Sequence, residues 1–487
     1  MSLLATAAFT FYSCSNDDTM SSTTTSQQES VNAFYMTLQV KGSANGTRTE
    51  QQADPNKENG TTEESTITNG TVYIYNGSSL VFKKDLTASD WSTAPSQTAT
   101  GTTKPIKVSV NSVAENTNYN VYFLANYSSS VADPINNDAL FNVSATGGLD
   151  YATDNKFVMF NQNDKSKTAN HSTVKFEATN KNEATPAQAS TIYMDRVVAR
   201  IDAPTVTATA IATPQDASAG EQTKHIEYIA SVSYVDYAVS NLNNHSYVMQ
   251  KWTVANNVWT LNTAASTNSN VSSYYKSYAT YGTKYEAKGL DNFGTTQKNY
   301  MFENTTNDAN NATAVYFRIK ANLSDDAKAL GVDFTDGTFY RYDNRVYTSI
   351  EAIQNDNEVA YPFVKVNADK STTAMTPAEV LAIIKGADGK LIAEGTTLAD
   401  FRQKYNIEVY REGNMYYRYA INDNWYTPTG YYSILRNSIY RLTVNAIYNM
   451  GKDVPNGPDI PDVTPNYYMN VTVGINPWVL NTQTIQL

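Results

Sequence analysis

Cys14 is the only cysteine in a chain of 487 residues, and only three histidines accompany it: His171, His225 and His245. Thiolate and imidazole groups at close spacing form zinc sites and nucleophile–base pairs. Here the histidines have no metal-like spacing, and Cys14 is far from all of them in the sequence. The sequence therefore predicts neither a zinc site nor a Cys/His nucleophile.

No motif of a common catalytic site is present: the sequence lacks G-x-S-x-G, a glycine-rich phosphate loop and a calcium loop of the D-x-D-x-D-G type. Acidic side chains occur in pairs within polar runs, where we interpret them as solvated loop charges: Asp17-Asp18, Glu63-Glu64 and Asp325-Asp326. Two carboxylates from separate strands can form a glycosidase site, so a secreted carbohydrate enzyme stays open as an alternative. We expect no catalytic residue, no metal and no cofactor.

Cys14 instead fits the attachment of a lipid. It follows an apolar run over residues 3–12, which is too short to span a bilayer as a mature helix but fits the core of a signal peptide. Residues 15–30 are rich in Ser, Thr, Gln and Asp, which is typical of a flexible tether. The sequence predicts lipidation at Cys14, with an ordinary cleaved signal or a disordered leader as the alternatives.

The composition favours a surface-exposed β protein. A net charge of −11 and a pI near 4.9 argue against nucleic acid as a partner. Tyrosine is abundant, with 36 residues, and it favours strands as threonine and valine do. With one cysteine the chain cannot be stabilised by internal disulfides.

A first strand is predicted over residues 31–41 from apolar residues at every second position. Its apolar face carries Phe34, Met36, Leu38 and Val40. A polar loop follows over residues 42–69, which is long for a connection inside a compact domain and indicates a functional or disordered segment.

Many further short strands are expected, and few helices. The strands are 71–75, 105–110, 119–125, 157–160, 192–201, 231–239, 315–320, 407–410, 415–421 and 438–448. One helix is predicted over 377–385 with Thr376 as N-cap and Glu379 completing a capping box, and a shorter one from Leu398 to Tyr405 with Thr397 as cap. The pattern indicates tandem β-sandwiches.

The C-terminus alternates strongly after a Pro/Gly-rich hinge over residues 455–465. We expect two strands, 467–475 and 479–487, separated by a break at Asn476-Pro477-Trp478. A hydrophobic strand at a chain end needs a sheet to join, and that sheet can belong to another molecule. The predicted parts are a leader and tether (1–30), an N-terminal sandwich (31–190), a C-terminal sandwich (191–451) and a hinge with a strand appendage (452–487).

The sequence resembles the major fimbrial subunits of Bacteroidales, the fimbrillins that build type V pili, and within them the short-fimbria major subunits. The resemblance rests on the leader with Cys14 and on several motifs that follow it in a fixed order. These motifs are Gly46-Thr47-Arg48, Tyr122–Asn126, Phe157–Phe160, Asp195–Ile201, Glu412–Tyr417, Leu435–Arg441, Val471-Thr472-Val473 and Pro477-Trp478.

This resemblance implies two transthyretin-like β-sandwich domains. It also implies export as a precursor acylated at Cys14 and held at the outer membrane by its lipid. An Arg-specific or trypsin-like protease would then cut between Arg48 and Thr49, in the loop behind the first strand. Arg48 is the first arginine of the chain and lies in a polar run, where cleavage is sterically easy.

Removal of residues 1–48 takes the first strand out of the N-terminal sandwich and exposes an apolar groove with unpaired backbone groups. The C-terminal segment of a neighbouring copy has the alternation to fill it, and we favour residues 478–487 as this donor strand, with Trp478, Val479, Ile485 and Leu487 as its apolar residues. The hinge prolines are expected to keep this arm from folding back onto residues 438–448. A head-to-tail contact of this kind generates a filament.

The predicted function is therefore a stalk subunit of a cell-surface fimbria that supports adhesion and biofilm. Its partners would be further copies of itself, accessory anchor and tip subunits, and the processing protease. The alternative is a monomeric surface lipoprotein adhesin, or a tip or accessory subunit, that binds glycan or protein. Aromatic residues over 415–419 could form a sugar platform, although cross-strand packing is the more common reason for such a stripe.

Overall fold

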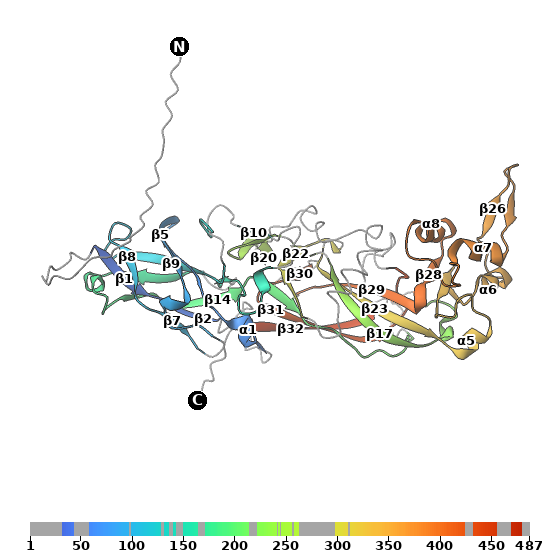
Figure 1. The fold of residues 1–487 in the computed structure, drawn as a ribbon, viewed down its shortest axis with the longest axis horizontal. Helices are drawn as coiled ribbons and strands as arrows, with labels where there is room; N and C mark the ends of the chain where they lie inside the picture. Colours follow the sequence, from blue (N-terminus) through green and yellow to red (C-terminus); the bar gives the residue numbers. More distant parts are fainter. Residues whose placement is uncertain are drawn as a thin grey trace, which may run out of the picture.

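The computed structural model describes residues 32–42, 58–96, 99–127, 131–135, 140–142, 150–163, 171–213, 222–240, 242–243, 245–255, 258–262, 298–309, 312–423, 432–454 and 469–479. These residues form a mainly β protein that extends along one axis (Figure 1). Three clusters of buried apolar side chains divide it into an N-terminal, a central and a distal unit. Among the described residues, no helix is both long enough and apolar enough to cross a bilayer.

The N-terminal unit is built from two sheets around one core. The smaller sheet has the order β13–β1–β8, with β1 at Ala33–Thr37, β8 at Ile106–Ser109 and β13 at Ala187–Gln188. The larger has the order β5–β4–β9–β11–β14–β2–β7–β6, with β12 added to β9. Its strands are β2 (Gln39–Gly42), β4 (Gly70–Asn76), β5 (Ser79–Leu86), β6 (Trp91–Thr93), β7 (Gly101–Thr103), β9 (Asn118–Ala125), β11 (Met159–Asn161), β12 (Ser172–Lys175) and β14 (Ile192–Arg196).

The central unit also buries its core between two sheets. One has the order β21–β15–β31–β32–β3, with β16 on β31; the other has the order β17–β23–β29. The strands are β3 (Glu58–Asn59), β15 (Val198–Ile201), β16 (Thr205–Val206), β17 (Ile229–Ser240), β21 (Asn299–Phe302), β23 (Ala314–Leu323), β29 (Asn414–Ala420), β31 (Ser438–Ile447) and β32 (Met469–Val479). A four-residue helix, α1 (Thr62–Ser65), follows β3 and lies where the two units meet (Figure 1).

The described residues also form a three-stranded sheet in the distal unit, with β24 (Phe339–Tyr342) between β25 (Arg345–Tyr347) and β28 (Glu408–Tyr410), and four two-stranded sheets. The two-stranded sheets pair β10 (Leu140–Asn142) with β18 (His245–Tyr247), β19 (Lys251–Ala255) with β20 (Val258–Asn262), β22 (Asn304–Thr306) with β30 (Tyr432–Ile434), and β26 (Val364–Val366) with β27 (Thr372–Ala374).

The distal unit was not expected from the sequence. It is inserted between β23 and β29, which are hydrogen-bonded neighbours in the central unit, and it has its own buried cluster within residues 334–409. Its elements are β24 (Phe339–Tyr342), β25 (Arg345–Tyr347), α6 (Ile350–Asn355), α7 (Pro377–Ile384), α8 (Thr396–Tyr405) and β28 (Glu408–Tyr410). The short helix α5 (Asp325–Ala329) precedes them and buries Ala327 in the central core. Two helices of the distal unit, α7 and α8, were predicted and α6 was not, and the core that the three helices share depends on contacts between distant segments.

The two predicted helices differ in accuracy. For α7 the capping box is present: the Glu379 backbone N–H donates to Thr376 Oγ1 at 3.3 Å, and the Thr376 backbone N–H donates to Glu379 Oε2 at 2.8 Å. For α8 the expected start at Leu398 with Thr397 as cap is wrong, because the N-cap is Gly395 and Thr397 lies inside the helix. The Ala399 N–H bonds to the Gly395 carbonyl, so the helix begins two residues earlier, at Thr396, without a side-chain cap.

The predicted strand over residues 192–201 divides between the two units. β14 belongs to the larger N-terminal sheet, and β15 begins the central unit after the single residue Val197. The change of sheet therefore falls at Val197, whereas the expected boundary at residue 190 placed both strands in the second unit. The apolar residues on both sides of Asp195-Arg196 indicate that both parts are buried, but not that they are buried in different cores.

Candidate functional site

The first strand is shared by both sheets of the N-terminal unit. β1 lies between β13 and β8 in the smaller sheet, and β2 lies between β14 and β7 in the larger one. The predicted single strand over 31–41 is therefore two short strands that meet at Leu38. Removing this segment would take a central strand out of each sheet at once.

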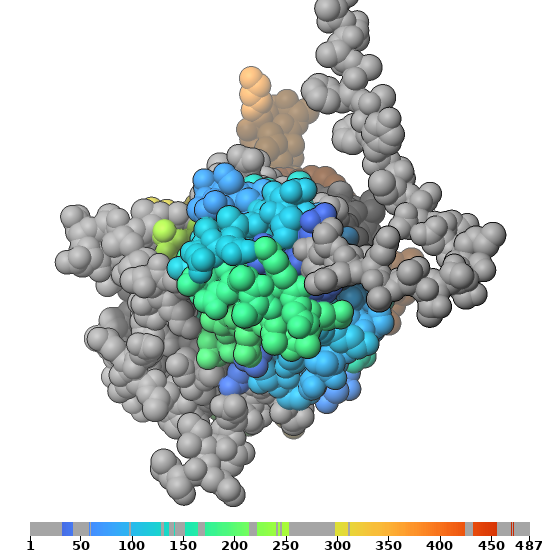
Figure 2. All heavy atoms as spheres, turned by 90° about the vertical axis from the view of Figure 1, so that its left-hand side faces the viewer, coloured from blue at the N-terminus to red at the C-terminus, as the bar shows by residue number. Residues whose placement is uncertain are grey.

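The predicted apolar face of this segment is completely buried. The exposed fraction is 1% for Phe34 and 0% for Met36, Leu38 and Val40. Burial of such side chains contributes about 1.5–3 kcal/mol each. In the end-on view of the unit, the dark blue of the first strand shows only in small patches among the cyan and green segments around it (Figure 2).

Backbone groups of the first strand are satisfied on both sides at the point where it changes sheets. The Leu38 N–H donates to Thr103 Oγ1 at 2.9 Å, and the Leu38 carbonyl accepts from the Thr103 N–H at 3.1 Å. On the other side the Thr37 carbonyl accepts from the Ala189 N–H at 3.0 Å. A chain that replaced this segment would have to supply the same alternation of apolar side chains and of donors and acceptors.

The position of the first strand is apolar and aromatic on its inner side. The Phe34 ring lies with its centroid 5.3 Å from that of Phe176. The residues paired with the first strand in the two sheets are also core residues: Ile106, Val108, Ala187, Ile192 and Met194. Loss of the strand would expose these residues to water, so the trimmed unit would be driven to bury them again.

Several predicted site residues lie outside the described residues, so their placement is not part of the site geometry. These are Cys14, Arg48, Thr49, Ile485 and Leu487. Trp478 and Val479 are described as backbone at the end of β32.

The C-terminal strand differs from the prediction. β32 runs without interruption through Asn476-Pro477-Trp478, and it pairs antiparallel with β31 from Ile447 opposite Met469 to Ser438 opposite Pro477. The expected break was wrong, and so was the expectation that the hinge prolines would keep this segment off residues 438–448. A proline removes one donor from a ladder and does not end a strand that is held by its other pairs.

Beyond Pro477 a second strand covers the outer edge of β32. Glu58 and Asn59 of β3 pair in parallel with Trp478 and Val479. Trp478 and Val479, the root of the predicted donor segment, therefore pair with β3 of their own subunit, just beyond the last pair with β31 at Pro477.

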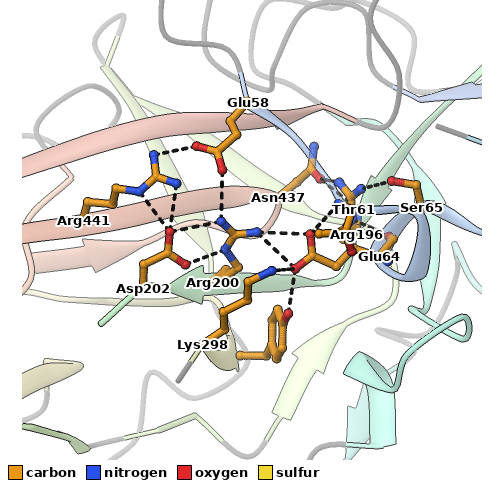
Figure 3. A network of polar contacts seen from close by, with 11 residues as sticks. Glu58, Thr61, Glu64, Ser65, Arg196, Arg200, Asp202, Lys298, Asn437 and Arg441 are labelled. Atoms are coloured by element: carbon orange, nitrogen blue, oxygen red, sulfur yellow. Dashed lines mark hydrogen bonds and ion pairs between the residues drawn. The ribbon is translucent and has the colours of Figure 1, made fainter. Parts of the chain in front are cut away.

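A buried polar network joins the N-terminal and central units beside this strand (Figure 3). Thr61 caps α1, and its N–H donates to Glu64 Oε2 at 2.8 Å. The Glu64 carboxylate also accepts from Arg200 Nη1 at 3.1 Å, from Lys298 Nζ at 3.0 Å and from Tyr300 Oη at 2.7 Å. Since Arg200 and Tyr300 belong to central-unit strands, one carboxylate ties α1 to that sheet.

The partners of Glu64 keep it ionised although its exposed fraction is only 1%. Burial by itself raises the pKa of a carboxyl group. Hydrogen bonds from the Thr61 N–H and from Tyr300, with the charge of Arg200, outweigh burial and hold the pKa of Glu64 at about 2.

Arg196, the last residue of β14, occupies the other side of α1 and is fully buried. Its Nε donates to the Glu64 carbonyl at 2.8 Å, its Nη2 to Ser65 Oγ at 3.0 Å and its Nη1 to Asn437 Oδ1 at 3.2 Å. Asn437 in turn donates to Asp195 Oδ1 at 2.8 Å. Burial lowers the pKa of the Arg196 guanidinium to about 9.

The interpretation of Glu63-Glu64 as solvated loop charges is wrong for Glu64. The sequence carried a signal for its role, because Thr61-x-x-Glu64 has the spacing of a capping box. The burial of its carboxylate has no sequence signal, since its partners are more than 130 residues away.

The aromatic stripe over residues 415–419 is part of β29. Met415 and Tyr417 are buried in the core of the central unit, and the Tyr417 hydroxyl donates to the Asn449 carbonyl at 2.9 Å. This side of the strand is engaged in packing.

Two family models match the chain. The model described as "Major fimbrial subunit protein (FimA)" covers residues 34–196, and the model described as "Major fimbrial subunit protein type IV, Fimbrillin, C-terminal" covers residues 408–484. The chain belongs to the fimbrillin family. In this fimbrillin the first match begins in β1 and ends at the last residue of β14, so it spans the N-terminal unit; the second runs from β28 beyond β32.

Solved structures of similar proteins were also found. A fimbrilin from Porphyromonas gingivalis has 13% identity over 93% of this chain and 100% of its own, with a TM-score of 0.41. A putative cell adhesion protein from Parabacteroides distasonis has 14% identity over 94% of this chain and 100% of its own, also with a TM-score of 0.41. The tip fimbrial protein Mfa3 from Porphyromonas gingivalis, truncated at its C-terminus, has 11% identity over 92% of this chain and 100% of its own, with a TM-score of 0.30. No curated protein sequence gave a significant match.

Proposed function

We propose that this fimbrillin is a stalk subunit of a cell-surface fimbria, of the short-fimbria type, which polymerises by exchange of its C-terminal strand. Its precursor is acylated at Cys14 and held at the outer membrane. A protease specific for arginine, or trypsin-like, cuts between Arg48 and Thr49. The trimmed subunit loses its first strand and takes up the C-terminal segment of a neighbour.

One observation carries this proposal: the first strand lies inside both sheets of the N-terminal unit, yet its covalent link to the other strands of that unit is the single connection over residues 43–57. A cut in this connection makes a central strand removable. The four buried side chains of the strand, with its backbone bonds, define what must replace it.

The donor is assigned to the chain end. Residues 480–487 follow β32 directly, and Ile485 and Leu487 alternate there with the polar residues Thr484 and Gln486. The gap that the first strand leaves in the acceptor subunit requires such an alternation, because a shift of one residue would turn every side chain of the donor strand to the wrong face. A head-to-tail contact between unlike surfaces leaves each end of the assembly open, so it extends as a filament with an anchor subunit at one end and a tip subunit at the other.

The processing step is tested with an Arg-specific protease on the purified full chain. Arg48→Ala should leave uncut monomer, whereas the matched control Lys57→Ala, in the same connection, should be cut and form filaments as the native chain does. Size-exclusion chromatography and negative-stain microscopy report the outcome. Filaments from the Arg48→Ala chain would refute the processing site.

The donor is tested by deletion of residues 480–487, which leaves every described residue of β32 in place. This chain should be cut normally and remain monomeric. Replacement of Ile485 and Leu487 together by asparagine should have the same effect, while replacement of the polar neighbours Thr484 and Gln486 by serine should not. A deleted chain that still forms filaments would show that another segment is the donor. If the native chain also stays monomeric after cleavage, the monomeric adhesin is the better description.

The lipid anchor is tested separately in cells. Cys14→Ser should abolish incorporation of a labelled fatty acid and reduce the surface-exposed precursor, whereas Ser13→Ala should leave both unchanged. Labelling of the Cys14→Ser chain would exclude this thiol as the acceptor.

A further inference from the structure

β3 is the outermost strand of the large central sheet, and it covers the root of the donor segment. The order at this edge is β15–β31–β32–β3, so β32 has β31 on one side and β3 on the other. Only Trp478 and Val479 pair with β3. These are the last two described residues before the segment 480–487.

The Glu58 side chain reaches from β3 across β32 to the two strands beyond it. Its carboxylate pairs with Arg441 of β31, with Oε2 at 2.5 Å from Nη1, and with Arg200 of β15, with Oε1 at 3.2 Å from Nη2 (Figure 3). In the ladder of β31 and β32, Arg441 is paired with Gly474. The ion pairs and the backbone pairing together hold β3 beside β32.

The two arginines are themselves held in place. Asp202 accepts from Arg200 Nε at 2.7 Å and from Arg441 Nε at 2.9 Å. The Arg200 side chain is only 4% exposed, while those of Glu58 and Arg441 are 32% and 42% exposed. The bridge is therefore anchored in the interior and open to water at its outer end, so it can break without unfolding the sheet.

β3 is tethered on both sides in the uncut chain. Towards the C-terminus it leads within two residues to α1, which Glu64 and Arg196 fix at the junction. Towards the N-terminus it is joined through residues 43–57 to Gly42, which is paired with β14. A cut after Arg48 removes the second tether, and a two-residue strand near a new chain end frays more readily.

We propose that β3 is a latch that holds the root of the donor segment on its own subunit until the connection over residues 43–57 is cut. Cleavage then has two effects: it makes the first strand removable, and it loosens the strand that covers Trp478 and Val479. Acceptor and donor become available in the same step, which suppresses strand exchange between uncut precursors. This inference rests on the proposed function for the role of residues 480–487, but the latch itself can be measured without polymerisation.

The test is hydrogen exchange, followed by mass spectrometry, on the uncut full chain. Glu58→Gln removes the charge of the bridge and keeps the shape of the side chain, and Arg441→Gln removes its outer partner. Each should make the backbone amides of Asn476, Trp478 and Val479 exchange about fivefold faster, as expected for loss of a part-exposed ion pair. The double variant should add little to Glu58→Gln, because the contact with Arg441 is already lost in that variant. Asp325→Asn, which removes an exposed ion pair with Lys328 within α5, is the control and should change nothing at β32.

The same amides are then measured in the native chain after cleavage at Arg48, on the fraction that is monomeric by size-exclusion chromatography. They should exchange faster than in the uncut chain. Unchanged exchange in both single variants, or no change on cleavage, would overturn the latch. If Glu58→Gln raises exchange throughout the central unit, the result for Arg441→Gln decides whether the latch exists, because Arg441 is more exposed and its replacement disturbs the core less. Faster exchange in a chain that never polymerises would support the latch and refute the function assigned to the tail.

Discussion

Leu38→Ala should destabilise the precursor but not the processed subunit. Leu38 has no exposed surface, and it lies at the point where the first strand passes from one sheet to the other. Truncation of such a leucine costs about 2–5 kcal/mol, because the cavity cannot close fully. We therefore expect the free energy of opening of the N-terminal unit to fall by about 3 kcal/mol in the uncut chain. After cleavage at Arg48 the difference should disappear, because the altered residue leaves with the strand.

The assay is hydrogen exchange of the amides of β9, a central strand in the same unit, which reports the opening of that unit without requiring the whole chain to unfold in one step. Leu330→Ala is the matched control: Leu330 is 61% exposed, so the same change should cost less than about 0.5 kcal/mol. If the processed Leu38→Ala protein remains less stable than the processed native protein, the cut strand has stayed in place, and displacement by a neighbour is refuted.

Three further outcomes follow from the fold. Because the folded-state pKa of Glu64 is lowered from 4.5 to about 2, the stability that its carboxylate contributes is present above about pH 4.5 and is lost as the pH falls towards 2. Glu64→Gln should remove this part of the pH dependence of unfolding. It should also cost about 3–5 kcal/mol at pH 7 in denaturant titrations, because it leaves buried cations short of a partner. Gly70→Ala should destabilise the N-terminal unit, because its Cβ would lie 2.4 Å from the Leu124 carbonyl oxygen; a thermal midpoint equal to that of the native chain would contradict this. Thr376→Ala should cost about 1 kcal/mol by removing the cap of α7, and Thr376→Ser should restore most of it, as measured by exchange of the first-turn amide of Glu379.

The sequence by itself determined the properties that depend on local pattern. Alternation located the first strand with its buried side chains Phe34, Met36, Leu38 and Val40, and Thr376 with Glu379 marked the start of α7. The mainly β composition and the ordered motifs were sufficient to indicate a fimbrillin before any contact was known. These features are encoded within a few residues of each other, where the periods of side-chain direction and the geometry of caps act.

Only the tertiary structure decided how these pieces share their surfaces. It divided the first strand between two sheets, placed β32 between β31 and β3, gathered the helices of the distal unit around a separate core, and buried Glu64 against Arg200 and Tyr300. Each of these depends on segments far apart in the chain, whose pairing is set by the total burial and hydrogen bonding of the fold and not by the pattern of any one segment.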